Sequence, residues 1–165
     1  MPILTKQSLE FISRGADQTR RVGMRLGSLL QTGDLICLIG ELGSGKTTLV
    51  QGINAGWGSL DQVTSPTFVL INVYRRPEGG RLFHVDAYRL YNPREVIDLD
   101  LDSLLDTGPI VIEWADRIKT ELPSDHLWVM LQCIDDTQRD ILFEGCGDRY
   151  TVLVQQLQRV IYGIS

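Results

Sequence analysis

Hydrophobic residues along the chain follow both strand-like and helical spacing, and the two patterns alternate. Residues 35–39 form a short apolar run of the length typical of a buried strand. Apolar side chains at helical spacing predict a helix over about residues 17–30 with Asp17 as its N-cap, another starting near Lys46, and a C-terminal one over about residues 150–161. This alternation of strand and helix favours an α/β fold.

Two neighbouring stretches predict a β-hairpin. Residues 68–74 and 81–88 are rich in β-branched and aromatic side chains, and the sequence PEGG between them is typical of a turn. Other patterns predict an edge strand at 3–11, further strands at 110–112, 127–134 and 141–145, and one or two short helices with an acidic face at 93–105. Together these elements predict a three-layer α/β sandwich around a mixed, mostly parallel central sheet.

Length, composition and charge describe an ordinary globular domain. The chain has 165 residues, of which 43% are hydrophobic and 22% are charged, so it can bury a core and is not expected to be disordered. Its formal net charge of −5 argues against broad, nonspecific nucleic-acid binding through a basic surface. The charge still allows the protein to act beside an RNA-binding partner.

The cysteines and the apolar runs bear on cellular location. Cys37, Cys133 and Cys146 show no C-x-x-C spacing, so neither a disulfide framework nor a zinc site is expected. No stretch approaches membrane-spanning length, and the N-terminus lacks a basic segment followed by a long apolar run. We therefore expect a cytoplasmic protein with no membrane association. No heptad pattern or long exposed apolar segment indicates a homo-oligomer.

The strongest chemical signal follows the first buried strand. Gly40, Gly45, Lys46 and Thr47 occupy the fixed positions of a G-x-x-x-x-G-K-[ST] phosphate-binding pattern. These glycines and Gly43 allow backbone N–H groups to curl around a phosphate, and the following helix directs its positive end at the same place. Lys46 can contact the terminal phosphates, and Thr47 can give its hydroxyl to a magnesium ion. The pattern therefore predicts phosphate binding.

Two acidic residues stand at the ends of predicted strands. Asp86 follows the run LFHV, and Glu113 follows the run IVI. Because ligands of open α/β sheets bind beyond the carboxyl ends of the strands, both side chains could face the phosphates. Asp86 is the candidate acidic residue for the magnesium shell, and Glu113 is a candidate second metal-shell residue or the group that orients the attacking water. The alternative is that both carboxylates only cap neighbouring helices.

Four further residues allow a functional and a structural interpretation. Thr67 could offer its hydroxyl to magnesium or to the γ-phosphate, as nucleotide-sensing switch loops do, or it could belong to an ordinary loop. Trp114 could stack near the nucleotide or fill the core. His84 falls on the same strand face as Asp86, whereas His126 has no carboxylate or serine pattern around it. Neither histidine shows a metal-ligand pattern, so structural roles are favoured for both.

Four separate blocks of sequence resemble those of one protein family in their order and spacing. They are GELGSGKTT at 40–48, SPTF at 65–68, HVDAYRL at 84–90 and IEWADR at 112–117. Together with the later Leu122-Pro123, they resemble the bacterial TsaE (YjeE) family, the ATPases of tRNA threonylcarbamoyladenosine biosynthesis. The resemblance extends over about residues 8–147.

This resemblance implies a single P-loop ATPase domain over residues 1–165 that binds ATP or ADP with Mg²⁺. It implies weak ATPase activity that partner proteins stimulate, and assembly with the TsaB–TsaD pair. In that machinery TsaD transfers the threonylcarbamoyl group to the adenosine beside the anticodon, so the ATPase meets tRNA only indirectly through the complex. Its nucleotide cycle is implied to reset the transferase between turnovers.

The resemblance also carries roles over to individual residues of this chain. The family's motifs match the catalytic candidates Lys46, Thr67, Asp86 and Glu113, and the metal-binding candidates Thr47, Asp86 and Glu113. The residues expected to bind the nucleotide are Glu41, Leu42, Gly43, Ser44, Gly45, Lys46, Thr47, Thr48 and Trp114. One departure is Ala115-Asp116, where many members have Pro or Gly followed by Glu, and the acidic character is retained.

Three other functions share the phosphate-binding loop. A small-molecule or nucleoside kinase needs an acceptor pocket and usually a lid with clustered arginines, for which Arg75, Arg76 and Arg81 could be mistaken. A GTP-binding switch protein is disfavoured because no N-K-x-D or D-x-x-G block occurs. A noncatalytic, nucleotide-dependent assembly module overlaps with the family interpretation, and turnover measured with partners present would distinguish the two.

Overall fold

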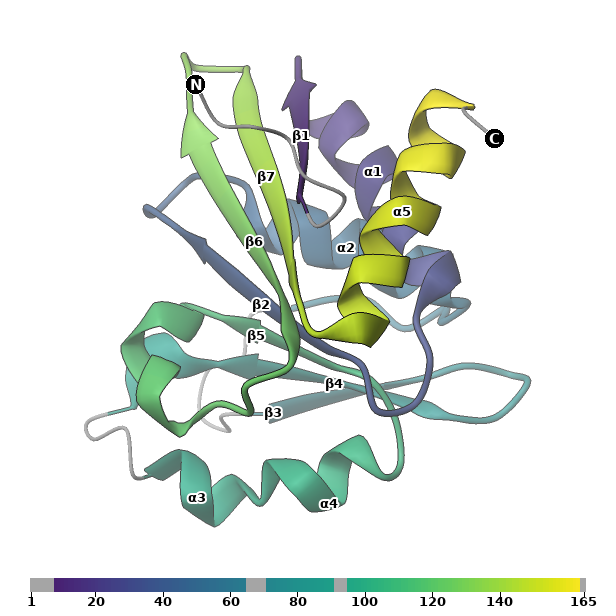
Figure 1. The fold of residues 1–165 in the computed structure, drawn as a ribbon, viewed down its shortest axis with the longest axis vertical. Helices are drawn as coiled ribbons and strands as arrows, with labels where there is room; N and C mark the ends of the chain where they lie inside the picture. Colours follow the sequence, from purple (N-terminus) through teal and green to yellow (C-terminus); the bar gives the residue numbers. More distant parts are fainter. Residues whose placement is uncertain (1–7, 65–70, 91–94, 164–165) are drawn as a thin grey trace.

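The computed structural model describes residues 8–64, 71–90 and 95–163, which form one sheet with helices on both faces (Figure 1). The strands are β1 (Ser8–Ser13), β2 (Leu35–Gly40), β3 (Ile71–Arg75), β4 (Arg81–Asp86), β5 (Ile110–Glu113), β6 (His126–Cys133) and β7 (Arg139–Cys146). The helices are α1 (Ala16–Leu29), α2 (Lys46–Trp57), α3 (Glu95–Leu99), α4 (Leu101–Leu105) and α5 (Asp148–Tyr162), with 3₁₀ helices η1 (Ala87–Arg89) and η2 (Ala115–Glu121). Within the described ranges, no helix has both the length and the apolar character needed to cross a membrane.

The sheet is mixed, and most of its strands run in one direction. The strand order is β1-β7-β6-β2-β5-β4-β3. β2 pairs in parallel with both β5 and β6, and β4 pairs in parallel with β5. β3 is antiparallel to β4, and β7 is antiparallel to both β6 and β1. Thus β1, β2, β4, β5 and β6 share one direction, which confirms the predicted mixed, mostly parallel sheet.

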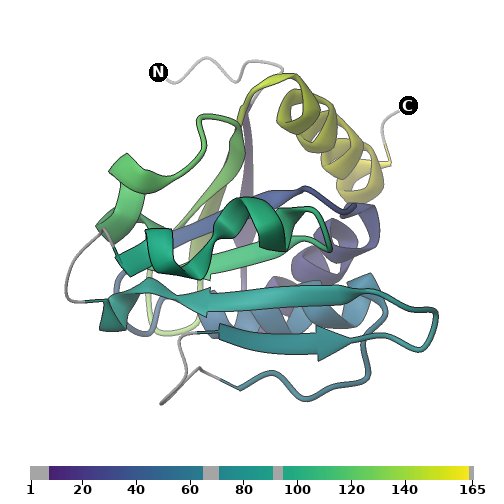
Figure 2. The same cartoon turned by 90° about the horizontal axis from the view of Figure 1, so that it is seen from below.

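Alternate residues of the central strands point to opposite faces of the sheet and build two hydrophobic layers. In β2, Ile36 and Leu38 belong to the cluster that contains residues of α1, α2 and α5. Leu35 and Cys37 of the same strand belong to the cluster that contains residues of α3, α4 and η2. Figure 2 shows α3 and α4 on the side of the sheet away from α1 and α2. The three-layer sandwich predicted from the sequence is therefore confirmed.

Helices α1 and α2 approach each other closely because glycines lie between them. A Cβ atom at Gly27 of α1 would overlap the backbone carbonyl oxygen of Ile53, and one at Gly56 of α2 would overlap that of Met24. Gly23 faces α2 in the same way. The close packing holds α2 against α1, and α2 is the helix that begins at the phosphate-binding loop.

Several element boundaries differ from the sequence prediction. The strand expected at 3–11 corresponds to β1, which continues to Ser13, and residues 3–7 lie outside the described part of the chain. Asp17 is not the N-cap of α1, because Gly15 occupies that position and Asp17 pairs with Arg20 at 2.9 Å in the first turn. The second hairpin strand ends at Asp86 and does not continue to Tyr88. The Asp86 carboxylate accepts a hydrogen bond from the backbone N–H of Tyr88 at 2.9 Å, which turns the chain into η1.

Candidate functional site

The glycine-rich loop lies between the carboxyl end of β2 and the start of α2. Gly43 and Gly45 have φ angles of 79° and 102°, in the left-handed region that favours glycine. A Cβ atom at Gly40 would lie 2.5 Å from Ser44 Oγ, so the loop folds back closely on itself. The predicted strand, loop and helix thus occur in the predicted order, and the first turn of α2 leaves its N–H groups directed toward the loop.

Lys46 is buried within this loop. Its Nζ donates hydrogen bonds to the carbonyl oxygens of Gly40 at 2.6 Å and Glu41 at 2.9 Å, and to Ser44 Oγ at 3.3 Å. Burial lowers the pKa of the Lys46 ammonium, and the nearby Glu113 carboxylate opposes that shift. The ammonium therefore lies among oxygen atoms of its own loop, and phosphate oxygens are acceptors of the same kind.

The two predicted strand-end carboxylates lie side by side. The parallel register of β4 and β5 pairs Asp86 with Glu113, so both side chains leave the sheet on the same face. Glu113 is also in register with Leu38 of β2, the strand that leads into the loop. The Thr47 hydroxyl donates to Glu113 Oε1 at 3.4 Å. The structure therefore brings Thr47, Asp86 and Glu113 together, as the sequence interpretation expected.

Two aromatic side chains line the region beside Lys46. Lys46 Nζ lies 4.0 Å from the centre of the Trp114 ring, a cation–π contact that places Trp114 in the site. Tyr88 packs on Trp114 with ring centres 4.9 Å apart. Sequence reasoning did not single out Tyr88, although it stands two residues after Asp86. The turn of η1, which brings it back over Trp114, was not predicted.

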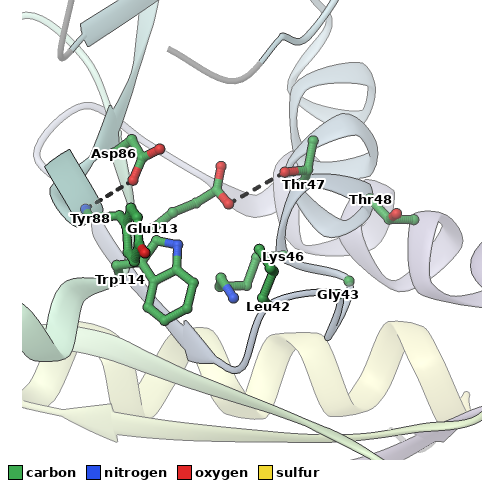
Figure 3. Close-up of a pocket in the computed structure, with 10 residues that line it drawn as sticks. Leu42, Gly43, Lys46, Thr47, Thr48, Asp86, Tyr88, Glu113 and Trp114 are labelled. Atoms are coloured by element: carbon green, nitrogen blue, oxygen red, sulfur yellow. Dashed lines mark hydrogen bonds between the residues drawn. The ribbon is translucent and has the colours of Figure 1, made fainter. Parts of the chain in front are cut away.

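These residues surround a cavity of about 540 Å³, shown in Figure 3. Its lining consists of Leu42, Gly43, Gly45, Lys46, Thr47, Thr48, Asp86, Tyr88, Glu113 and Trp114. Loop and α2 residues form one side, and residues at or just after the carboxyl ends of β4 and β5 form the other. Glu41 and Ser44 are not part of the lining, and instead provide acceptors for the Lys46 ammonium.

The donor set of this cavity fits a phosphate with a magnesium ion. An ammonium and a helix N-terminus provide positive charge, and the Thr47 hydroxyl and two carboxylates are the oxygen ligands that magnesium prefers. Among the described residues, no group of three or more His, Cys, Asp and Glu side chains could hold a metal ion by itself. The arrangement suits a cation that takes part of its coordination from phosphate oxygens and water.

The remaining sequence candidates lie elsewhere or have a different environment. Thr67 falls within residues 65–70, outside the described part of the chain, so its role stays a prediction. His126 lies at the amino end of β6 and bonds through Nδ1 to the Pro123 carbonyl oxygen at 2.9 Å. His84 is fully buried, and its Nε2 lies 2.5 Å from Glu113 Oε2. This contact depends on the pairing of β4 with β5, which the sequence pattern does not show.

Comparison with known proteins identifies the family to which this chain belongs. A family model described as threonylcarbamoyl adenosine biosynthesis protein TsaE matches residues 13–141. The chain belongs to the TsaE family. Family members named tRNA threonylcarbamoyladenosine biosynthesis protein TsaE include one from Streptomyces coelicolor, 44% identical over 137 residues that cover 79% of this chain and 93% of the relative. Another from Bacillus subtilis is 33% identical over 155 residues, covering 93% of this chain and 96% of the relative.

A solved structure also resembles this TsaE family member in its fold. The crystal structure of Bacillus subtilis YdiB superposes with a TM-score of 0.77 at 30% sequence identity, covering 94% of this chain and 97% of that chain. The fold is thus that of a P-loop NTPase. Membership also connects the chain with tRNA threonylcarbamoyladenosine biosynthesis, as the sequence blocks indicated.

Proposed function

We propose that this chain is the ATP-binding and ATP-hydrolysing component of the threonylcarbamoyladenosine machinery, and that it supports repeated turnover of a TsaB–TsaD transferase complex. The observation that supports this proposal most is that the phosphate-binding loop and the strand-end carboxylates line opposite sides of one cavity. Lys46 and the start of α2 face Asp86 and Glu113, and the Thr47 hydroxyl of α2 donates to Glu113. Phosphoryl transfer depends on such positioning of positive charge, metal ligands and a group that orients the nucleophile.

Each residue has a distinct part in the proposed reaction. Lys46 exchanges its loop carbonyl partners for the terminal phosphate oxygens and neutralises their charge. Thr47 and Asp86 would hold Mg²⁺, with Glu113 as a second metal-shell residue or the acceptor that orients water. Bound Mg²⁺ would supply charge neutralisation at the phosphates. Thr67, from the SPTF block, is proposed to add a hydroxyl to the same centre.

The proposed partners follow from the family and from charge. The net charge of −5 disfavours direct, nonspecific binding of tRNA, so we propose that tRNA is met only through TsaB and TsaD. We propose that the isolated chain hydrolyses ATP weakly and that complex formation stimulates this hydrolysis. We also propose that the protein acts in the cytoplasm. We also propose that the whole chain acts as one P-loop ATPase domain.

The kinase alternative has less support than the ATPase proposal. An arginine lid would have to lie over the phosphates, beyond the carboxyl end of β4. Arg76 instead lies in the β3–β4 turn at the amino end of β4, where it stacks on Trp57 at 4.3 Å and donates to the Trp57 carbonyl oxygen at 3.1 Å. The hairpin arginine therefore stabilises the opposite end of the sheet.

ATP hydrolysis by the purified chain, alone and with TsaB and TsaD, tests this proposal. We expect a low rate alone, a higher rate with both partners, and loss of the stimulated rate in Glu113→Gln. Formation of a phosphorylated small molecule in an acceptor screen, without stimulation and without complex formation, would instead support a kinase.

A further inference from the structure

A buried chain of hydrogen bonds leads from Glu113 away from the cavity. His84 lies in the middle of β4, fully buried, and each of its ring nitrogens has a partner. Nε2 contacts Glu113 Oε2 at 2.5 Å, and Nδ1 contacts the Tyr74 hydroxyl at 2.8 Å. The Tyr74 hydroxyl in turn lies 3.3 Å from the backbone nitrogen of Thr64 and 3.1 Å from its carbonyl oxygen. Three strands and a loop thus contribute to one polar chain.

The donors and acceptors of this chain limit where its protons can lie. The backbone N–H of Thr64 can only donate, so the Tyr74 hydroxyl accepts that bond and has one proton left to give. The Thr64 carbonyl already receives a bond from Asn72 Nδ2 at 2.7 Å. The Tyr74 hydroxyl can donate this proton to the Thr64 carbonyl oxygen, which has a second lone pair, or to His84 Nδ1, which is the shorter contact at 2.8 Å against 3.1 Å. Donation to Nδ1 leaves the imidazole proton on Nε2. An Nε2–H group then donates to the Glu113 carboxylate, and every member of the chain has a hydrogen-bond partner.

This arrangement fixes the orientation of a side chain that would otherwise rotate. Glu113 is 5% exposed, and its Oε2 is held by His84 while Oε1 faces the Thr47 hydroxyl. A glutamate with one oxygen anchored in this way presents the other to the cavity in one direction. The anchor is set by strand register, because His84 precedes Asp86 by two residues on the face that Glu113 shares.

We propose that His84 is a positioning residue that donates through Nε2–H to Glu113, and that Tyr74 selects the required imidazole tautomer. The role of Glu113 in turnover rests on the proposed function above, whereas the direction of the hydrogen bond does not. If His84 only filled space in the buried layer, its role would not depend on which ring nitrogen carries the proton. The proposal therefore makes one spectroscopic claim and one kinetic claim, and each can fail separately.

Long-range ¹H–¹⁵N NMR of the uniformly labelled full chain tests the spectroscopic claim. The chain contains only two histidines, so His84→Gln and His126→Gln assign the imidazole signals directly. We expect the His84 imidazole to carry its proton on Nε2 in the wild type, and loss of this single tautomer in Tyr74→Phe. The matched control Tyr162→Phe, which removes a hydroxyl bonded to the Glu10 carbonyl, should leave the signal unchanged. A proton on Nδ1 of His84 in the wild type would overturn the proposal.

Steady-state kinetics of the complex with TsaB and TsaD test the positioning role. We expect His84→Leu to lower kcat about 10- to 100-fold while KM and ADP affinity stay within about twofold. His84→Gln retains an amide donor that can reach Glu113 and should recover most of that loss. His126→Gln is the control and should match the wild type. Equal losses in folded His84→Leu and His84→Gln, or an unchanged kcat in folded His84→Leu, would refute positioning through this bond.

The two experiments also separate this proposal from the function on which it rests. Absence of hydrolysis by the wild-type complex would contradict the proposed function, and the NMR result would still decide whether His84 donates to Glu113. Hydrolysis that is insensitive to the His84 variants would contradict only the positioning role.

Discussion

Substitution of Gly27 in α1 by alanine tests whether close packing against α2, the helix that carries Lys46, outweighs the higher helix propensity of alanine. Gly27 lies in the last turn of α1, and a Cβ atom there would overlap the carbonyl oxygen of Ile53 and lie 2.9 Å from the backbone nitrogen of Trp57. Both of these atoms belong to the backbone of α2, so they cannot move away as the end of a flexible side chain could. The methyl group would force α1 and α2 apart.

The two physical effects have opposite signs, which makes the outcome decisive. Alanine in a helix interior is ordinarily favoured over glycine by about 1 kcal/mol. Overpacking of a well-packed core costs about 1–3 kcal/mol, and the upper part of that range applies where the clash is with backbone. We therefore expect Gly27→Ala to lower the free energy of unfolding by about 1–2 kcal/mol. For a domain of this size that corresponds to a fall in Tm of about 2–8 °C.

Urea and thermal unfolding of Gly27→Ala measure this effect, with Ser28→Ala as the control. Ser28 is the exposed neighbour on the same helix, so its substitution should change the free energy of unfolding by no more than about 0.5 kcal/mol. Because separation of the helices also moves the start of α2, we expect Gly27→Ala to weaken nucleotide binding as well. A Gly27→Ala protein that is as stable as the wild type, or more stable, would refute the packing argument.

Three other predictions concern the site and the fold. Asp86→Asn and Glu113→Gln should abolish most ATP turnover while nucleotide binding stays measurable by fluorescence titration, and normal turnover in both would contradict their assigned roles. Thr47→Ala should reduce the gain in nucleotide affinity that Mg²⁺ gives over EDTA, and an unchanged gain would exclude Thr47 as a ligand. Burial raises the pKa of Tyr150 to about 12, and its hydroxyl accepts from the Leu35 N–H at 2.8 Å. The unfolded chain loses this proton first, near pH 10, so stability should decline by up to about 3 kcal/mol as the pH rises from about 10 to 12. Urea unfolding should show a shallower decline in Tyr150→Phe, and equal slopes would contradict the linkage.

The parts of the site that depend on local sequence could be predicted. The loop pattern fixed the sequence of strand, turn and helix around Lys46, because glycine requirements and helix starts depend on neighbouring residues. Asp86 and Glu113 could be placed at strand ends, and the rule that ligands bind beyond the carboxyl ends of parallel strands brought them to the same edge. The structure places both beside Thr47 in one cavity.

The parts that depend on strand register could not be predicted. The contact between His84 and Glu113 requires β4 to lie beside β5, and the contact with Tyr74 requires the exact pairing of β3 with β4. Tyr88 reaches Trp114 only because η1 turns the chain after Asp86. These contacts depend on residues far apart in the sequence, whereas hydrophobic periodicity reports only on local structure.

Isothermal titration of ADP with Mg²⁺ into the wild type and Lys46→Ala tests most directly whether this cavity binds a nucleotide. A hydrogen bond to a charged group contributes about 1.5–3 kcal/mol, so loss of one Lys46 contact should weaken binding about 10- to 150-fold. Lys119→Ala is the matched control, because its ammonium lies over Trp128, which does not line the cavity. We expect the wild type and Lys119→Ala to bind ADP equally, and Lys46→Ala to bind far more weakly. Equal affinity in all three proteins, or no binding by the wild type, would contradict the assignment.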